Sequence, residues 1–357
     1  MGETLGLRQV KTPATSAFRF ARWLDSSYNN PAAPLGTVRL LLSPSDFETA
    51  NVPELAQLPP EALPATRANV KEAVDEWFTD CKTRSENVAI LYAGGHGIQI
   101  APDDGGIVLL EDFAENLSVL EGSLDVGAVR SGMAGPTMAQ RQFYFVDACR
   151  VRPEAASRFR TLGGQGVDLP NPFEGAPRVS VVYYAATPST TALGAPGNGT
   201  LFVQALLECL NTALGVDGHA LDDGTWAVTT TTLVRELPKR VRELAAEHGD
   251  DQTPTIGGQF EDVPFHVLAG RPQVPITLEL VPDAATACAV ASLVESPNQV
   301  DVFAEVAFTP TITREVPAGS YLLSVKIQPP TPPFTDVKNI IVTALPPKFK
   351  GVVKVGQ

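Results

Sequence analysis

The chain has 357 residues, 44% hydrophobic and 19% charged, so it can bury a sizeable core and is long enough for more than one domain. Its net charge of −13 argues against nucleic acid or an anionic membrane as the main partner and favours positively charged peptides. The sequence contains no apolar run near the roughly 20 residues of a membrane span, no signal-peptide core, and no metal or disulfide spacing among its four cysteines. We expect a soluble cytoplasmic protein with no resident metal or other cofactor.

Helix and strand patterns alternate in the N-terminal part of the chain. Residues 16–25 place four apolar side chains on one helical face, and residues 37–42 (TVRLLL) are typical of a strand. After a proline-rich connector, Thr66 can cap a helix whose apolar residues recur at helical spacing as far as Cys81. This order predicts parallel strands joined by helices.

Two apolar runs of strand length each stop at a reactive side chain. Asn87–Ile98 (NVAILYAGGHGI) contains His96, and Arg141–Arg150 (RQFYFVDACR) contains Cys149. Ligands of open α/β sheets bind beyond the carboxyl ends of the strands, so we expect both side chains at the same edge of one sheet.

His96 and Cys149 form a chemically sensible pair. A thiol with a pKa of about 8.5 is only partly ionised at neutral pH, and a neighbouring imidazole that takes the proton raises the thiolate fraction. The backbone amides of Gly97 and Cys149 could form an oxyanion hole, in which one donor contributes roughly 3 to 4 kcal/mol to transition-state stabilisation. The pattern indicates acyl-transfer chemistry.

Residues 99–140 are rich in Gly, Asp and Ser, and so long a stretch with few periodic positions predicts a functional or mobile loop. A second irregular stretch follows Cys149 and contains five arginines. The ordinary interpretation of this second stretch is a solvated surface loop.

The composition changes after Gly270. Residues 271–357 are electrically neutral, so the whole net charge belongs to the first 270 residues. Alternating runs in this tail (ITLELV, VDVFAEVAF, SYLLSVKI and NIIVTAL) predict an antiparallel β-sandwich. We expect two domains, residues 1–270 and 271–357, the second an immunoglobulin-like or transthyretin-like accessory domain.

The two reactive segments resemble those of the caspase-like cysteine peptidases, which include caspases, metacaspases and bacterial relatives. The resemblance rests on Gly-His-Gly at 95–97 and on Asp-Ala-Cys-Arg at 147–150. His96 and Cys149 are 53 positions apart (96 to 149), and an interval of about 50 is typical of caspases. Residues 181–210 and 252–265 follow in the family's order, so the match covers roughly residues 15–268.

The resemblance implies an α/β fold with a mostly parallel sheet flanked by helices, here followed by the antiparallel β-sandwich. It also implies a cysteine endopeptidase with a Cys149–His96 dyad. Caspases carry Gln where this chain has Asp147, and that Gln helps to bind an acidic substrate residue. Metacaspases carry an acid at this position and cleave after Arg or Lys. We therefore expect protein or peptide substrates with a basic P1 residue bound by Asp147 in the S1 pocket. Asp103 and Asp104 are more simply interpreted as acidic turn residues, although they could add negative charge to this pocket.

The family also suggests how the enzyme is regulated. In caspases the segment after the catalytic cysteine is cut in the zymogen, so an Arg-specific enzyme could cleave itself here, with Arg158 and Arg160 the expected points. Some metacaspases need calcium, and the acidic segment 101–115 could bind it, although this segment lacks the ligand spacing of an EF-hand. Bacterial relatives act in stress, antiviral defence or cell death, which could involve an activating protein partner.

The sequence bears on two other function classes. The Gly-Gly-His-Gly stretch does not have the spacing of a P-loop or a dinucleotide fingerprint, so a nucleotide site is disfavoured. A catalytically silent caspase-like scaffold that acts as a protein-interaction module stays open as the alternative to a peptidase.

Overall fold

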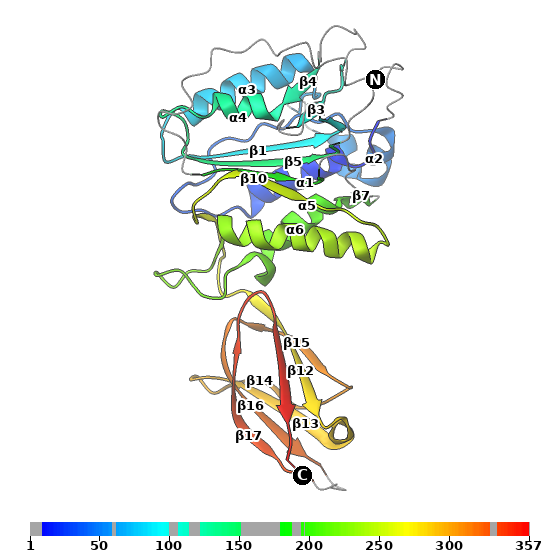
Figure 1. Ribbon diagram of the computed structural model, residues 1–357, viewed down its shortest axis with the longest axis vertical. Coiled ribbons are helices and arrows are strands. Elements are labelled where there is room, and N and C mark those ends of the chain that lie inside the picture. Colours follow the sequence, from blue (N-terminus) through cyan, green and yellow to red (C-terminus); the bar gives the residue numbers. More distant parts are fainter. Residues whose placement is uncertain are drawn as a thin grey trace. The chain divides into compact units, whose positions relative to one another are not determined.

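The computed structural model describes residues 9–58, 62–99, 106–113, 122–150, 179–187, 194–195, 197–328 and 334–356. The chain divides into two compact units (Figure 1). The first unit comprises residues 1–207 and 234–263, and the second comprises residues 208–233 and 264–357. No helix in the described part of the chain combines the length and the apolar character that crossing a membrane requires.

A four-stranded sheet is the centre of the first unit in its described residues. Its order is β1 (Val88–Gly95), β5 (Arg141–Ala148), β6 (Val179–Tyr184) and β10 (Thr255–Gln259). The first three strands are parallel, and β10 runs antiparallel to β6. Strands β5 and β6 are buried along almost their whole length, as expected for apolar runs covered on both faces.

Helices cover both faces of this sheet (Figure 1). On one face, α1 (Pro13–Ser26) places the ring of Phe20 5.4 Å from the rings of both Tyr92 and Phe145. On the other face, α3 (Arg67–Cys81) and α4 (Val126–Gly132) pack against the alternate side chains of the strands. The predicted α/β architecture of a mostly parallel sheet flanked by helices is confirmed.

Thr66 caps α3 as predicted, since its side chain accepts a hydrogen bond from the backbone N–H of Asn69. The helix ends at Cys81, a buried thiol whose pKa burial raises to about 12. Such a thiol stays protonated at neutral pH and behaves as a small apolar side chain.

The prediction of a strand at residues 37–42 is wrong. In the structure this segment forms no strand, and its one β-bridge joins Leu41 to Leu63. The Arg39 side chain pairs instead with two carboxylates of α3, at 2.7 Å from both Glu76 and Asp80. The segment is therefore attached to α3 by side chains, and β1 is an edge strand of the sheet within the described residues.

The prediction of a loop at residues 99–140 is also partly wrong, because this stretch contains β3 (Ile107–Leu109), β4 (Ser123–Asp125) and α4. The chain turns after β1 into β2 (Gly97–Ile98), which pairs with β3, and β3 pairs with β4 in a small antiparallel sheet. The other elements of this part of the chain are short: α2 (Asp46–Asn51), η2 (Pro53–Gln57), β2 (Gly97–Ile98), β3 (Ile107–Leu109), β4 (Ser123–Asp125), β7 (Gly194–Ala195) and β8 (Gly199–Thr200). Two longer helices follow, α5 (Leu201–Asn211) and α6 (Thr230–Glu247).

Two sheets share one apolar core in the described residues of the second unit. Their strands are β12 (Gln273–Val281), β13 (Ala289–Glu295), β14 (Val300–Ala307), β15 (Ile312–Pro317), β16 (Gly319–Ile327), β17 (Val337–Ala344) and β18 (Phe349–Lys354). The strand orders of the two sheets are β15-β12-β18 and β14-β13-β16-β17. The unit also contains η4 (Ala213–Gly215), η5 (Asp283–Cys288) and the paired strands β9 (Ala227–Thr229) and β11 (Pro264–Val267).

The predicted C-terminal β-sheet architecture is confirmed. All four of its expected strands are present as β12, β14, β16 and β17, and β13, β15 and β18 were not anticipated. Adjacent strands are antiparallel with one exception among the described pairs, since β12 and β18 are parallel.

Candidate active site

The register of the sheet brings the two predicted catalytic residues to one place. Strands β1 and β5 pair in parallel from Val88 with Arg141 to Gly95 with Ala148. His96 and Cys149 are each the next residue beyond this last pair. Adjacent strands lie about 4.8 Å apart, so the two backbones leave the sheet side by side. Both residues are half-buried.

Gly97 packs directly on the backbone of Cys149. A Cβ added to Gly97 would lie 2.0 Å from the Cys149 carbonyl oxygen and 2.8 Å from the Ala148 Cβ, so only glycine fits. The His96 carbonyl accepts a hydrogen bond of 2.8 Å from the Leu109 N–H, which ties this turn to β3. The role of the Gly97 and Cys149 amides as an oxyanion hole stays a prediction.

Asp147 lies in the interior, with 2% of its surface exposed. Its Oδ2 accepts hydrogen bonds from the hydroxyls of Tyr92 and Thr200, whereas its buried Oδ1 has no hydrogen-bond partner. Burial raises the pKa of Asp147 to about 6, and the two hydroxyls act in the opposite direction by stabilising the carboxylate. Burial, followed by proximity to this carboxylate, holds the pKa of Tyr92 well above its usual value.

The hydroxyl of Thr200 is positioned by α1. The Thr200 N–H donates to Ser16 Oγ at 2.8 Å, and Thr200 Oγ1 accepts from the Val203 N–H at 3.2 Å, where α5 begins. Gly199 has a φ of +78°, and a Cβ there would lie 2.8 Å from Ser16 Oγ. The chain can therefore make this close turn only with glycine, and the turn fixes Thr200 against Asp147.

Arg150 corrects the sequence interpretation, which placed it in a solvated loop. Only 6% of its surface is exposed. Its guanidinium lies 4.2 Å from the centre of the Tyr184 ring and donates to Thr255 Oγ1 at 3.2 Å. Burial lowers the pKa of Arg150. The residue after the predicted nucleophile thus links the ends of β5 and β6 to the start of β10.

Several predicted positions fall outside the described residues. These are the expected self-cleavage points Arg158 and Arg160, the acidic residues Asp103 and Asp104, and residues 101–105 and 114–115 of the segment proposed for calcium. Within the described ranges, no group of three or more His, Cys, Asp or Glu side chains could hold a metal ion.

Sequence reasoning did not identify Tyr92, Thr200 or Arg150 as parts of the site. The alternation of strand side chains could have found Tyr92, because it precedes Gly94 by two residues and Gly94 pairs with Asp147. Thr200 and Arg150 carry no comparable local signal, since their partners are distant in sequence.

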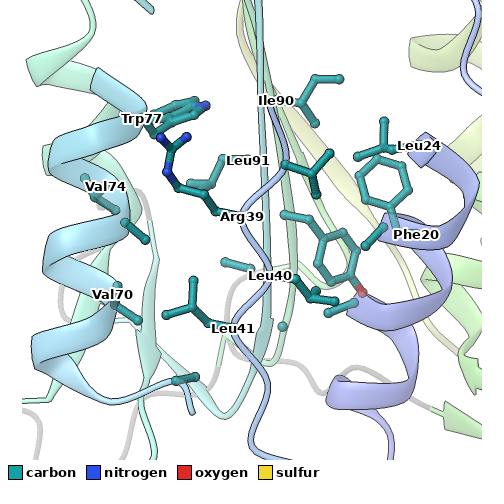
Figure 2. A pocket seen from close by; sticks show the side chains of 18 of the residues that line it. Phe20, Leu24, Arg39, Leu40, Leu41, Val70, Val74, Trp77, Ile90 and Leu91 are labelled. Carbon is teal, nitrogen blue, oxygen red and sulfur yellow. The ribbon is translucent and has the colours of Figure 1, made fainter. Parts of the chain in front are cut away.

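A cavity of about 1020 Å³ lies along the free edge of β1. Its lining reaches His96 at one end and Arg84 at the other. Figure 2 shows residues 39–41 running through it between α3 and α1. The labelled side chains on the two sides are mainly apolar: Val70, Val74 and Trp77 from α3, and Phe20 and Leu24 from α1. The cavity lies where the expected strand at 37–42 would have paired with β1.

Comparisons with known proteins identify the family of this chain. The family model described as a caspase domain matches residues 40–261. The chain is also similar to an uncharacterized protein, y4kE, of Sinorhizobium fredii, with 26% identity over 270 residues that cover 72% of this chain and 73% of that protein. The matched range contains β1, β5 and both predicted catalytic residues. The chain therefore belongs to the caspase-domain family of cysteine peptidases.

Proposed function

We propose that this protein is a cysteine endopeptidase that cleaves protein substrates after Lys or Arg, with Cys149 as nucleophile and His96 as its base. The observation that carries the proposal is the shared register of β1 and β5, which ends both strands at the same level next to Gly97.

The proposed reaction has two stages. His96 accepts the thiol proton, Cys149 Sγ attacks the scissile carbonyl, and the oxyanion is held by the amides of Gly97 and Cys149. The proton then passes from His96 to the leaving amine, and the acyl group stays on sulfur as a thioester. Water, deprotonated by His96, hydrolyses the thioester and restores the thiol.

The preference for a basic P1 residue is supported by Asp147. A buried carboxylate oxygen without a partner is costly in an apolar interior, and a cationic side chain would supply the missing partner. Because Asp147 is 2% exposed, the P1 side chain can reach it only if neighbouring elements move apart on binding.

Fluorogenic peptides with Lys or Arg at P1 test the proposal. Wild-type protein should hydrolyse them, and Cys149→Ala and His96→Ala should fold but lose turnover. Cys288→Ala is the matched control, because Cys288 is also a half-buried cysteine but lies in the second unit, and this variant should keep full activity. If turnover does not depend on Cys149 in any condition, the chain is instead the catalytically silent scaffold.

Self-cleavage at Arg158 or Arg160 is part of the proposal. Intact-mass measurement after prolonged incubation should then show two fragments for wild type and a single chain for Cys149→Ala. An intact wild-type chain that is active on peptides would remove self-processing and leave the peptidase activity in place.

A further inference from the structure

We infer that Tyr92 and Thr200 are specificity-determining residues that make the S1 pocket prefer Lys over Arg. The inference rests on the proposed function, in which Asp147 binds the P1 side chain. Tyr92 and Thr200 occupy one oxygen of that carboxylate and leave the other for the substrate.

Lys and Arg make different demands on a carboxylate. A guanidinium is planar and binds best with two parallel N–H groups, one to each carboxylate oxygen. An ammonium is a compact point charge and needs only one oxygen. A carboxylate with a single available oxygen therefore removes the geometric advantage of Arg and keeps the charge attraction for Lys.

The hydrogen bonds to Asp147 leave only one of its two carboxylate oxygens as an acceptor for the substrate. An ionised carboxylate oxygen has two lone-pair sites, and those of Oδ2 are taken by the hydroxyls of Tyr92 and Thr200. Thr200 Oγ1 accepts from the Val203 N–H, so its own hydrogen is directed to Asp147. Oδ1 is the remaining acceptor, and it has no hydrogen-bond partner.

The two hydroxyls are held from several elements and cannot simply rotate away. Tyr92 is in the middle of β1, and Thr200 is fixed to α1 through its N–H bond to Ser16. The guanidinium of Arg19 donates to the Gly197 carbonyl at 2.9 Å, which fastens the same turn to α1. Within the described residues, no cationic side chain forms an ion pair with Asp147, so its charge is not already neutralised by a partner in the protein.

The test compares two peptides that differ only in Lys or Arg at P1, assayed at pH 8 so that Asp147 is ionised. Wild type should show a higher kcat/KM for the Lys peptide. Tyr92→Phe and Thr200→Val each free a lone pair on Oδ2, so each should shift the ratio about tenfold toward Arg, mainly through KM, as expected for one gained charge-assisted hydrogen bond.

Two controls separate this effect from general damage to the site. Tyr144→Phe removes a buried tyrosine hydroxyl on the opposite face of the same sheet, where it bonds to Gln142, and should leave the ratio unchanged. Thr200→Ser keeps the hydroxyl and should retain the wild-type ratio. Because Tyr92→Phe removes a single atom, it provides the result even if Thr200→Val does not fold.

The outcomes distinguish failure of the proposed Lys preference from failure of the proposed peptidase function. A shift toward Arg in Tyr92→Phe with none in Tyr144→Phe supports the inference. Cleavage after basic residues with a wild-type preference for Arg, or with a ratio that Tyr92→Phe does not move, overturns the inference and leaves the proposed function intact. No Cys149-dependent cleavage of either peptide overturns the proposed function itself.

Discussion

Replacing Asp147 by Asn should stabilise the protein at neutral pH while removing its activity on basic substrates. Burial raises the pKa of this carboxyl from 3.8 to about 6. A raised carboxyl pKa means that the folded protein binds the proton more tightly than the unfolded chain does. This contribution to stability is fully present below pH 3.8 and is lost as the pH rises through about 6. At 1.36 kcal/mol per pKa unit, the ionised Asp147 costs roughly 3 kcal/mol at pH 7.5.

The neutral amide of Asn avoids this cost, so the free energy of unfolding of Asp147→Asn should exceed that of wild type by up to roughly 3 kcal/mol at pH 7.5. The difference should shrink between pH 6 and pH 4. Urea unfolding at several pH values measures it, with Asp25→Asn, an exposed carboxylate on α1, as the control.

The same variant should lose at least about 100-fold in kcat/KM for basic peptides, because the P1 cation loses its counter-charge. A variant that is no more stable than wild type at pH 7.5, or a stability difference independent of pH, would show that burial does not destabilise the Asp147 carboxylate.

Three further predictions follow from the site and the second unit. Protonation of Asp147 removes its charge, so the ratio of kcat/KM for a Lys peptide over a Gln peptide should fall as the pH drops through about 6; a constant ratio contradicts its role in S1. Gly97→Ala forces a Cβ onto the Cys149 carbonyl and should abolish turnover and lower the free energy of unfolding by about 2 to 4 kcal/mol, measured with urea, whereas an active variant would show that this contact is not required. Tyr321→Phe removes the hydroxyl that donates to the Pro317 carbonyl in the second unit, and should cost about 1 to 2 kcal/mol in urea unfolding while peptide turnover stays at the wild-type level.

The sequence predicts the parts of the fold that depend on local residue patterns and on the spacing between His96 and Cys149. β1 and β5 are long, rich in β-branched and aromatic residues, and end immediately before His96 and Cys149, so both their existence and their common edge could be expected. The cap at Thr66 is similarly local, because the hydroxyl and the N–H it bonds are three residues apart.

The features that sequence reasoning missed depend on distant partners. Residues 37–42 have a strand pattern, but Arg39 pairs with carboxylates of α3 and Leu41 bridges to Leu63, and the segment does not join the β1 ladder. Arg150 carries a charge typical of a surface loop, yet Tyr184 and Thr255 enclose it. The acidic character of position 147 could be read directly, but the occupation of one of its oxygens could not, since Thr200 is 53 residues away.

The path of the chain between the two units affects how the protein can be divided. Residues 208–233 leave the first unit, join the second, and return before the chain crosses finally at residue 264. Ala213 lies in the same apolar core as the C-terminal strands, and Trp226 packs against that core. A fragment that ends at residue 270 would keep residues 208–233 but lose the C-terminal strands that bury Ala213 and contact Trp226. Limited proteolysis should therefore not release a stably folded caspase-domain fragment by a single cut, and the caspase domain is best expressed as part of the whole chain.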